Sequence, residues 1–430
     1  MSELHGDTAE RPDPGAVRGP APAPRAATTL PYSDRPAWFR PVVLVALLLL
    51  AINLRPAVNA LGAVIPALRG DTGLTGASAG VLLALPTLSF ALLGVGAPAV
   101  AARIGSHRTV LLAVLAMIAG QLLRAVVPGV PMLFIGSVLT LAGIAAGNVL
   151  LPGLVRLHFP DRITVVTACY TVLLTAGGSI AAALTIPLQT SLGGDWRLGI
   201  GLWSALAAVA LIPWIATVVS VGRPLPRSSQ ARAIPVTSLR RSRLAWAMAG
   251  YFGLQSMQAY VAFGWLPEIY VDAGLSDQAA AFQVSLLTAI GIPIAAVVPW
   301  LLGRIHTPRV LIVAMIGCYA LGYLGLILSP GSAPSLWSIL LGLGGGSFPT
   351  ALTLIALRTR TAQGTLALSA FAQSAGYLIA SVGPVLFGII HDWTGGWTWS
   401  LIAICGVLVV HLFCGLGVSR RRFLEDELTA

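Results

Sequence analysis

The sequence contains no lysine and little charge of any kind. All 26 basic residues are arginines, Asp and Glu total 15, and charged residues make up only 10% of a 430-residue chain that is 56% hydrophobic. With a mean hydropathy of +0.85, the chain cannot bury its apolar residues inside one water-soluble globule, which excludes that class of protein. The net charge of +11 does not indicate a nucleic-acid surface, because the arginines form short clusters between apolar runs and this pattern reflects membrane topology.

Several signatures of chemistry are also missing from the sequence. The four cysteines fall inside apolar runs without the spacing of metal ligands, so we interpret them as small buried apolar residues. No phosphate-binding loop, nucleophile elbow or metal-ligand motif occurs, and no histidine pairs with a carboxylate deep in an apolar run. We therefore expect neither an ATP-driven pump nor a membrane-embedded enzyme, and no metal or other cofactor.

The sequence does contain a series of long apolar runs. Most are about 20 residues long, which an α-helix needs to cross a hydrocarbon core of about 30 Å, and none alternates like the strands of a membrane barrel. The predicted fold class is an all-α membrane protein with twelve transmembrane helices. The predicted spans are residues 41–68, 76–101, 109–127, 131–155, 163–189, 196–219, 244–270, 278–302, 309–328, 334–357, 365–390 and 397–418.

The polar segments between these runs predict the organisation of the chain. Residues 1–40 are rich in Pro, Ala and Gly and predict a disordered tail rather than a signal peptide. Residues 220–243 form a linker between the bundles 41–219 and 244–418, and a second tail covers residues 419–430. With both termini on one side, 22 of the 26 arginines lie on that side, so the positive-inside rule predicts cytoplasmic termini and a multi-pass protein of the cytoplasmic membrane.

The two halves of the chain repeat each other. A shift of 201 residues places the second half on the first at six points: Pro66 on Pro267, Gly73-Leu74 on Gly274-Leu275, Pro98 on Pro299, Arg103 on Arg304, Arg108 on Arg309 and Trp196 on Trp397. Two similar six-helix bundles form the plan of a secondary transporter, in which the substrate binds between the halves near the middle of the membrane.

With these features, the sequence resembles the major facilitator superfamily along its whole length after the tail. The superfamily pattern Gly-x-x-x-Asp-Arg-x-Gly-Arg-Arg between spans two and three appears as "PAVAARIGSHR", residues 98–108. Arg103, Gly105 and Arg108 match it, and the resemblance implies a role in gating for them. Pro98 and Ala102 replace the Gly and the Asp of the pattern, which argues against a gating salt bridge from that Asp.

Two shorter motifs resemble one branch of this superfamily. The segments "NLRPAV" in span one and "GWLPEIYVDAGLS", residues 264–276, at the end of span seven are similar to the cyanate and nitroimidazole transporters. The resemblance implies a transporter of that branch and leaves its substrate open.

Arg55 is the most unusual residue of the predicted spans. A charge at the centre of a span costs between about 2.5 and 17 kcal/mol unless it faces the bundle interior or a water-filled cavity. No predicted span offers a carboxylate at the depth of Arg55. Those nearest to the spans lie at outer helix ends or in outer loops: Asp195, Glu268, Asp272, Asp277 and Asp392. Arg55 could bind free carbonyls beside Pro56 or polar neighbours; alternatively, an anionic substrate supplies its counter-charge, since a guanidinium suits small planar anions.

Other polar residues of the spans are candidates for binding the substrate. Each could instead bond to another helix, and the resemblance favours those on spans one, four, seven and ten as lining the cavity. The candidates besides Arg55 are Asn53, Asn59, Asn148, Gln255, Gln258, Tyr260, Gln373 and Tyr377.

These observations predict a secondary or facilitative transporter, embedded as a monomer in the lipid bilayer. Its expected substrate is a small anion, or a small polar molecule with anion-like acceptors, that moves by alternating access between the halves. The second hypothesis is efflux of nitroimidazole-like compounds, although an exporter of cationic drugs would be expected to carry an acidic residue in its core. A receptor is the third hypothesis. Such a role normally requires a folded signalling domain, and the short tails and linker of this sequence do not predict one.

Overall fold

The computed structural model describes residues 36–93, 96–159, 161–221, 236–305 and 307–429. The predicted tail up to residue 35 and most of the predicted linker lie outside these residues. Residues Trp38–Ala430 form one compact unit, and its described part consists of helices and turns without a strand.

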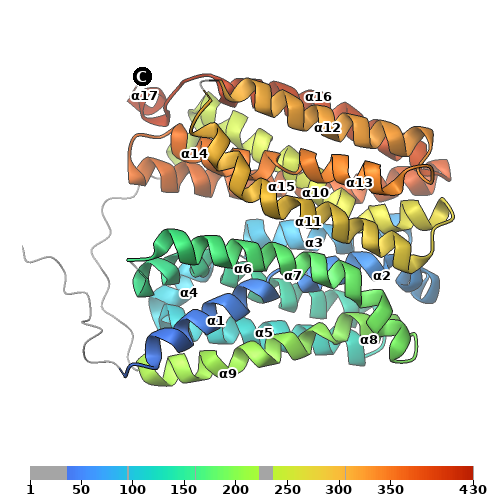
Figure 1. The fold of residues 1–430 in the computed structure, drawn as a ribbon, viewed down its shortest axis with the longest axis horizontal. Helices are drawn as coiled ribbons and strands as arrows, with labels where there is room; N and C mark the ends of the chain where they lie inside the picture. Colours follow the sequence, from blue (N-terminus) through green and yellow to red (C-terminus); the bar gives the residue numbers. More distant parts are fainter. Residues whose placement is uncertain (1–35, 94–95, 160, 222–235, 306, 430) are drawn as a thin grey trace, which may run out of the picture. The chain divides into compact units, whose positions relative to one another are not determined.

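The helices of this unit form two bundles (Figure 1). The helices of the first bundle are α1 (Phe39–Asn53), α2 (Pro56–Thr72), α3 (Gly76–Leu92), α4 (Ala97–Ile104), α5 (Ser106–Val126), α6 (Val130–His158), α7 (Ile163–Ser191), α8 (Trp196–Gly201) and α9 (Trp203–Val221). The helices of the second are α10 (Arg243–Asp272), α11 (Asp277–Leu302), α12 (Pro308–Leu328), α13 (Pro334–Gly344), α14 (Ser347–Leu357), α15 (Ala362–Thr394) and α16 (Trp397–Ser419). A short 3-10 helix, η2 (Val236–Arg241), precedes α10, and α17 (Leu424–Thr429) follows α16.

Every predicted span corresponds to a helix or to two consecutive helices. By length and composition, ten helical segments could cross a membrane, and α3 with α4 would make an eleventh. The remaining predicted span is α10, which is 30 residues long and mostly buried. Its polar residues, Gln255 and Gln258 among them, lower its hydropathy without preventing burial inside the bundle.

Four predicted spans differ from the expected continuous helix. The first divides between α1 and α2, the second between α3 and α4, the sixth between α8 and α9, and the tenth between α13 and α14. In the first, Pro56 occupies the opening position of α2, where its missing N–H costs nothing, and it disfavours helical geometry at the residue before it. The division therefore falls at Arg55.

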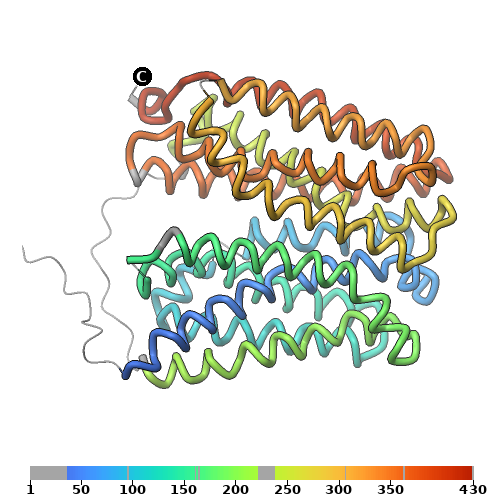
Figure 2. The backbone as a smooth tube through the Cα atoms, in the orientation of Figure 1, coloured from blue at the N-terminus to red at the C-terminus, as the bar shows by residue number. Residues whose placement is uncertain are grey.

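The internal repeat appears as the same hydrogen bond in each half. The indole Nε1 of Trp196 donates to Asp71 Oδ2 at 3.1 Å, and that of Trp397 donates to Asp272 Oδ2 at 2.7 Å. Both members of one pair are 201 residues from their counterparts, which confirms the offset that the sequence indicated. The backbone tube in Figure 2 lets the two halves be followed from blue to green and from yellow to red.

The bundles meet along three helix pairs. Helix α3 packs on α15, α7 on α11 and α2 on α10. Between α7 and α11, the hydroxyls of Ser179 and Ser285 each donate to the other's carbonyl, at 3.0 and 2.9 Å. We call the end of the unit that carries the α2–α3 and α10–α11 turns the distal end, and the end where α1 begins and α16 finishes the terminal end (Figure 1).

Glycines allow α3 and α15 to approach closely near the distal end. A Cβ atom added to Gly388 would lie 2.1 Å from the carbonyl oxygen of Gly76, and one added to Gly80 would lie 2.5 Å from that of Pro384. Because the obstacles are backbone atoms, they cannot yield without moving a helix.

Replacing Gly388 with alanine should therefore lower the melting temperature of the purified protein. Overpacking of this kind typically costs about 1–3 kcal/mol. Gly317→Ala is a suitable control, because a Cβ atom there meets nothing within 4 Å. Equal melting temperatures for the two variants would contradict close packing of α3 on α15.

Candidate functional site

Arg55 lies at the break between α1 and α2. The helix α1 ends at Asn53, and Arg55 adopts φ −120° and ψ −31° before Pro56 starts α2. The carbonyl of Arg55 is already engaged, since it accepts hydrogen bonds from the N–H groups of Val58 and Asn59 at 3.1 and 3.2 Å. The break thus places a guanidinium at the junction of two half-helices.

The guanidinium of Arg55 reaches the second bundle. Its Nη1 lies 3.4 Å from the phenol oxygen of Tyr260 on α10, which is longer than a normal N–H···O hydrogen bond and indicates a weak contact. Arg55 is half-buried, and within the described residues it makes no ion pair. The expected counter-charge is thus not supplied by a carboxylate of the described chain.

Three other arginines of the first bundle bind a carboxylate or a backbone carbonyl. Arg69 pairs with Glu268, and Arg197 lies 3.1 Å from Asp71. The buried Arg124 donates to the carbonyl of Ala57 at 3.3 Å. The carbonyl of Ala57, next to Pro56, thus binds Arg124.

The two asparagines of the first span bind backbone carbonyls. Asn59 is buried, and its Nδ2 donates to the Gly178 carbonyl of α7 at 3.0 Å, while its Oδ1 has no hydrogen-bond partner in the described structure. Asn53 donates to the carbonyls of Leu49 and Leu206 at 2.7 and 3.2 Å. Both therefore fix the half-helices on either side of Arg55 against neighbouring helices.

Asn148 lies on α6 beside the same break. A Cβ atom on the adjacent Gly147 would lie 2.8 Å from the side chain of Leu54, so α6 packs against the end of α1 at this point. Asn148 itself is half-buried.

The candidate residues of the second bundle fall into two groups. Tyr260 and Tyr377 lie near Arg55: the first contacts it, and the phenol of the second lies within range of its charge. We call Arg55, Tyr260 and Tyr377 the central cluster. The amide of Gln255 donates to Ser256 Oγ and that of Gln373 to Ser369 Oγ, both at 2.7 Å.

Gln258 differs from these residues because it is fully buried and both its Nε2 and Oε1 lack a hydrogen-bond partner among the described residues. A buried amide without partners is costly, so this position calls for an explanation beyond packing.

The residues predicted to gate lie at the terminal end. Gly105 separates α4 from α5 with φ +92°, a conformation that favours glycine, and Arg103 and Arg108 flank it with exposed side chains. Their gating role stays a prediction.

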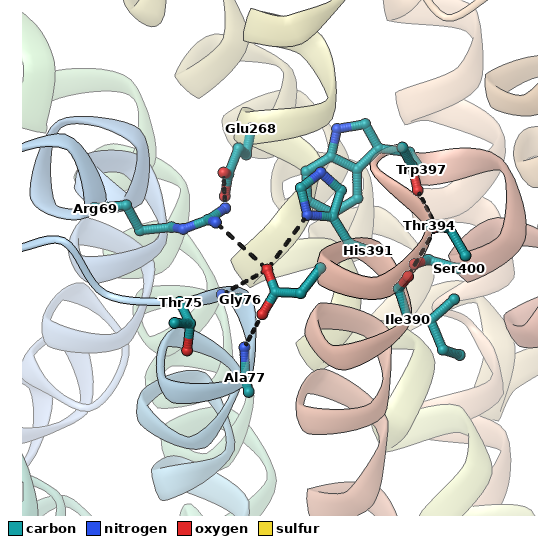
Figure 3. Close-up of polar contacts among 12 residues, drawn as sticks. Arg69, Thr75, Gly76, Ala77, Glu268, Ile390, His391, Thr394, Trp397 and Ser400 are labelled. Atoms are coloured by element: carbon teal, nitrogen blue, oxygen red, sulfur yellow. Dashed lines mark hydrogen bonds and ion pairs between the residues drawn. The ribbon is translucent and has the colours of Figure 1, made fainter.

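A second polar site, at the distal end, was not predicted from the sequence. Arg69 on α2 donates from Nη1 to Glu268 Oε1 on α10, and its Nη2 lies 3.8 Å from Asp392 Oδ1 on α15. Figure 3 shows these side chains converging from both bundles. We call Arg69, Glu268 and Asp392 the distal cluster.

Asp392 also closes the first turn of α3. Its two carboxylate oxygens accept hydrogen bonds from the backbone N–H groups of Gly76 and Ala77, each at 2.9 Å (Figure 3). A carboxylate at a helix N-terminus satisfies free donors and interacts favourably with the helix dipole. His391, the residue before Asp392, stacks on Trp397 with ring centroids 3.8 Å apart. Five helices, α2 and α3 of the first bundle and α10, α15 and α16 of the second, are thereby held together at this end.

The sequence did contain a signal for this cluster. Arg69 follows Pro66, and Glu268 follows the equivalent Pro267, so opposite charges lie close to matched positions of the repeat. Glu268 lies near the end of α10, as the sequence indicated, and is only 8% exposed.

The fold, with two bundles of membrane-spanning helices, is that of a membrane transporter. The chain belongs to the Major Facilitator Superfamily, whose family model matches residues 43–377. Its relatives are transporters rather than enzymes, and they include a 2-nitroimidazole transporter and a cyanate transport protein of the branch that its motifs resemble.

Three curated relatives match nearly the whole chain. An uncharacterized transporter of Bacillus subtilis (strain 168), YycB, is 34% identical over 89% of this chain and 94% of its own length. The 2-nitroimidazole transporter of Escherichia coli (strain K12) is 32% identical over 89% and 96%, and the cyanate transport protein CynX of the same organism is 28% identical over 86% and 96%.

Solved structures confirm the fold. A bacterial homolog of the human lysosomal transporter Spinster, solved in an inward-facing and unoccupied conformation, superposes with a TM-score of 0.76 at 16% identity, over 91% of this chain and 99% of that one. The nucleoside transporter NupG gives a TM-score of 0.71 at 13% identity, over 88% and 98%. At such low identity the likeness concerns the fold alone.

Proposed function

We propose that this protein moves a small anionic solute across the cytoplasmic membrane by alternating access, with Arg55 as the counter-charge of the solute. The observation that carries the proposal is the position of Arg55: it lies at a helix break, half-buried, facing the other bundle, without a carboxylate partner among the described residues. A permanent cation is costly at this depth unless it binds something.

The chemistry of the central cluster supports an anion as the ligand. A guanidinium presents a planar fork of N–H donors that fits the two oxygens of a carboxylate. Tyr260 receives a hydrogen bond from Arg55 and retains its own O–H proton, so it can donate to the same anion. Asn53 and Asn59 hold the half-helices that position Arg55, and the proposed site also includes Asn148, Tyr377 and Gln373.

The orientation and state of the protein belong to the same proposal. Cytoplasmic termini place 22 of the 26 arginines on the cytoplasmic side, and the protein works as a monomer with one site between its bundles. On this orientation the distal cluster closes the outer side.

Efflux of nitroimidazole-like compounds is the second candidate function. The 32% identity to a 2-nitroimidazole transporter favours it. A nitro group carries two acceptor oxygens in a plane, so it offers the guanidinium of Arg55 a geometry similar to that of a carboxylate but without the charge.

A thermal-shift screen of the detergent-purified protein distinguishes the two functions. The panel contains cyanate, small carboxylates, nitroimidazoles and cationic drugs, each tested on the parent, on Arg55→Gln and on Arg304→Gln. The last variant removes an exposed arginine at the terminal end and serves as the matched control. Stabilisation by anions in the parent and the control, but not in Arg55→Gln, supports anion transport. Stabilisation by neutral or cationic compounds in all three would contradict it and favour efflux.

A further inference from the structure

A row of aromatic rings begins beside Arg55 and runs into the second bundle. Phe90 on α3 packs on Tyr377 of α15 with ring centroids 5.3 Å apart, and Tyr377 packs edge to face on Phe252 of α10 at 5.1 Å. Phe252 in turn lies 5.9 Å from Phe348 at the start of α14. We call Phe90, Tyr377, Phe252 and Phe348 the aromatic row.

The aromatic row lies at about the same depth in the bundles as the central cluster. At 1.5 Å per residue, Phe90, Tyr377 and Arg55 are all roughly 20–26 Å along their helices from the distal end. Tyr377 joins the two features, since its ring belongs to the row and its phenol lies within range of the charge of Arg55.

Exposure distinguishes this row from ordinary core packing. Phe90, Tyr377 and Phe348 are each half-buried, although they lie on helices in contact with others on several sides. Phe252, the fourth member of the row, is buried in the core of the second bundle, as Phe387 outside the row is. Of these rings, Phe90 and Tyr377 meet across the contact between α3 and α15, which joins the two bundles.

We propose that the solute is a planar aromatic monocarboxylate, whose carboxylate binds Arg55 and Tyr260 while its ring packs against Phe90 and Tyr377. This inference rests on the proposed function and narrows it: Arg55 supplies the affinity for an anion, and the aromatic row selects the body attached to it. Rings of this kind prefer an aromatic partner to a saturated one, because edge-to-face and offset contacts add to the apolar area that is buried.

The test compares benzoate, cyclohexanecarboxylate and acetate by isothermal titration of the intact protein. Benzoate and cyclohexanecarboxylate share a six-membered ring and a carboxylate but differ in aromaticity. An aromatic contact should make benzoate bind about two- to tenfold more tightly than cyclohexanecarboxylate. Acetate, which has no ring, should bind more weakly than both.

Variants of the row locate the preference. In Phe90→Leu and Tyr377→Leu, the ratio of the two dissociation constants should fall to about one, and in Phe90→Leu the binding of acetate should remain. Phe371→Leu is the matched control, because Phe371 packs on Trp246 outside the row, so the ratio should not change. The comparison in the parent needs no variant and stands even if one of them fails to fold.

The possible failures can be told apart. Binding of all three carboxylates that requires Arg55 but shows no preference for benzoate overturns the aromatic solute and leaves the proposed function intact. A preference that survives in both row variants also overturns it. If the binding of the carboxylates does not depend on Arg55, both the proposed function and this inference are overturned.

Discussion

Replacing Arg55 with glutamine should weaken anion binding by at least about 100-fold while the protein still inserts and folds. Hydrogen bonds to charged groups are worth about 1.5–3 kcal/mol each, and a carboxylate held by the guanidinium fork would lose two of them. Folding should survive because Arg55 forms no ion pair within the described residues and makes a single long contact to Tyr260. Titration calorimetry with the anion found in the screen measures the loss.

Arg55→Lys separates charge from geometry in the same experiment. Lysine keeps the positive charge but presents it as a point rather than a planar fork. The affinity of the Arg55→Lys variant for the anion should therefore lie between those of the parent and Arg55→Gln. Arg304→Gln, which changes the net charge equally at an exposed position, should bind as the parent does. An unchanged dissociation constant in Arg55→Gln would refute the role of Arg55 as counter-charge.

Replacing Glu268 with glutamine should open the distal end of the protein. Arg69 and Glu268 are largely buried, with side-chain exposures of 18% and 11%, and each belongs to a different bundle. Removing one partner of a buried ion pair typically costs about 3–5 kcal/mol, and the cost falls on the closed arrangement in which the pair is formed. A closed-to-open ratio that falls by about two orders of magnitude is the expected result.

Spin labels report this opening directly. Suitable sites are Thr190 on α7 and Gln278 on α11, both exposed and near the distal end, after replacement of the native cysteines. The measured distance should lengthen in Glu268→Gln and should be restored when Arg69→Glu is combined with Glu268→Arg.

The matched control for this variant is Asp161→Asn, at the terminal end. It also converts a carboxylate to an amide, but its ion pair with Arg40 lies within the first bundle. If Glu268→Gln and Asp161→Asn gave the same distances as the parent, the distal cluster would not hold the bundles together.

The sequence predicted those parts of the structure that depend on residues close together in the chain. Long apolar runs predicted the spans, and matched positions such as Trp196 and Trp397 predicted the repeat, because these patterns report hydrophobic burial and local turns. Arg55 stood out for the same reason, since a charge in an apolar run is visible without any knowledge of packing.

The remaining features depend on which helices meet. The partner of Asn59 is a backbone carbonyl of α7, and no side-chain pattern reveals a carbonyl. Asp392 binds the first turn of α3, more than 300 residues away in the chain, through donors that every helix possesses. Phe90 was not singled out, because one phenylalanine in an apolar run carries no signal until its neighbour Tyr377 is known.

The long contact between Arg55 and Tyr260 has a consequence for the rate at which the carrier works. A loaded carrier would hold a neutralised pair at its centre as it changes conformation, whereas an empty one would have to move with an uncompensated cation. For a protein that works as proposed, the empty return is then the slow half of the cycle. Solute on the opposite side of the membrane should remove this slow step, because the carrier then returns loaded. Exchange of solute across the membrane should therefore be faster than net transport.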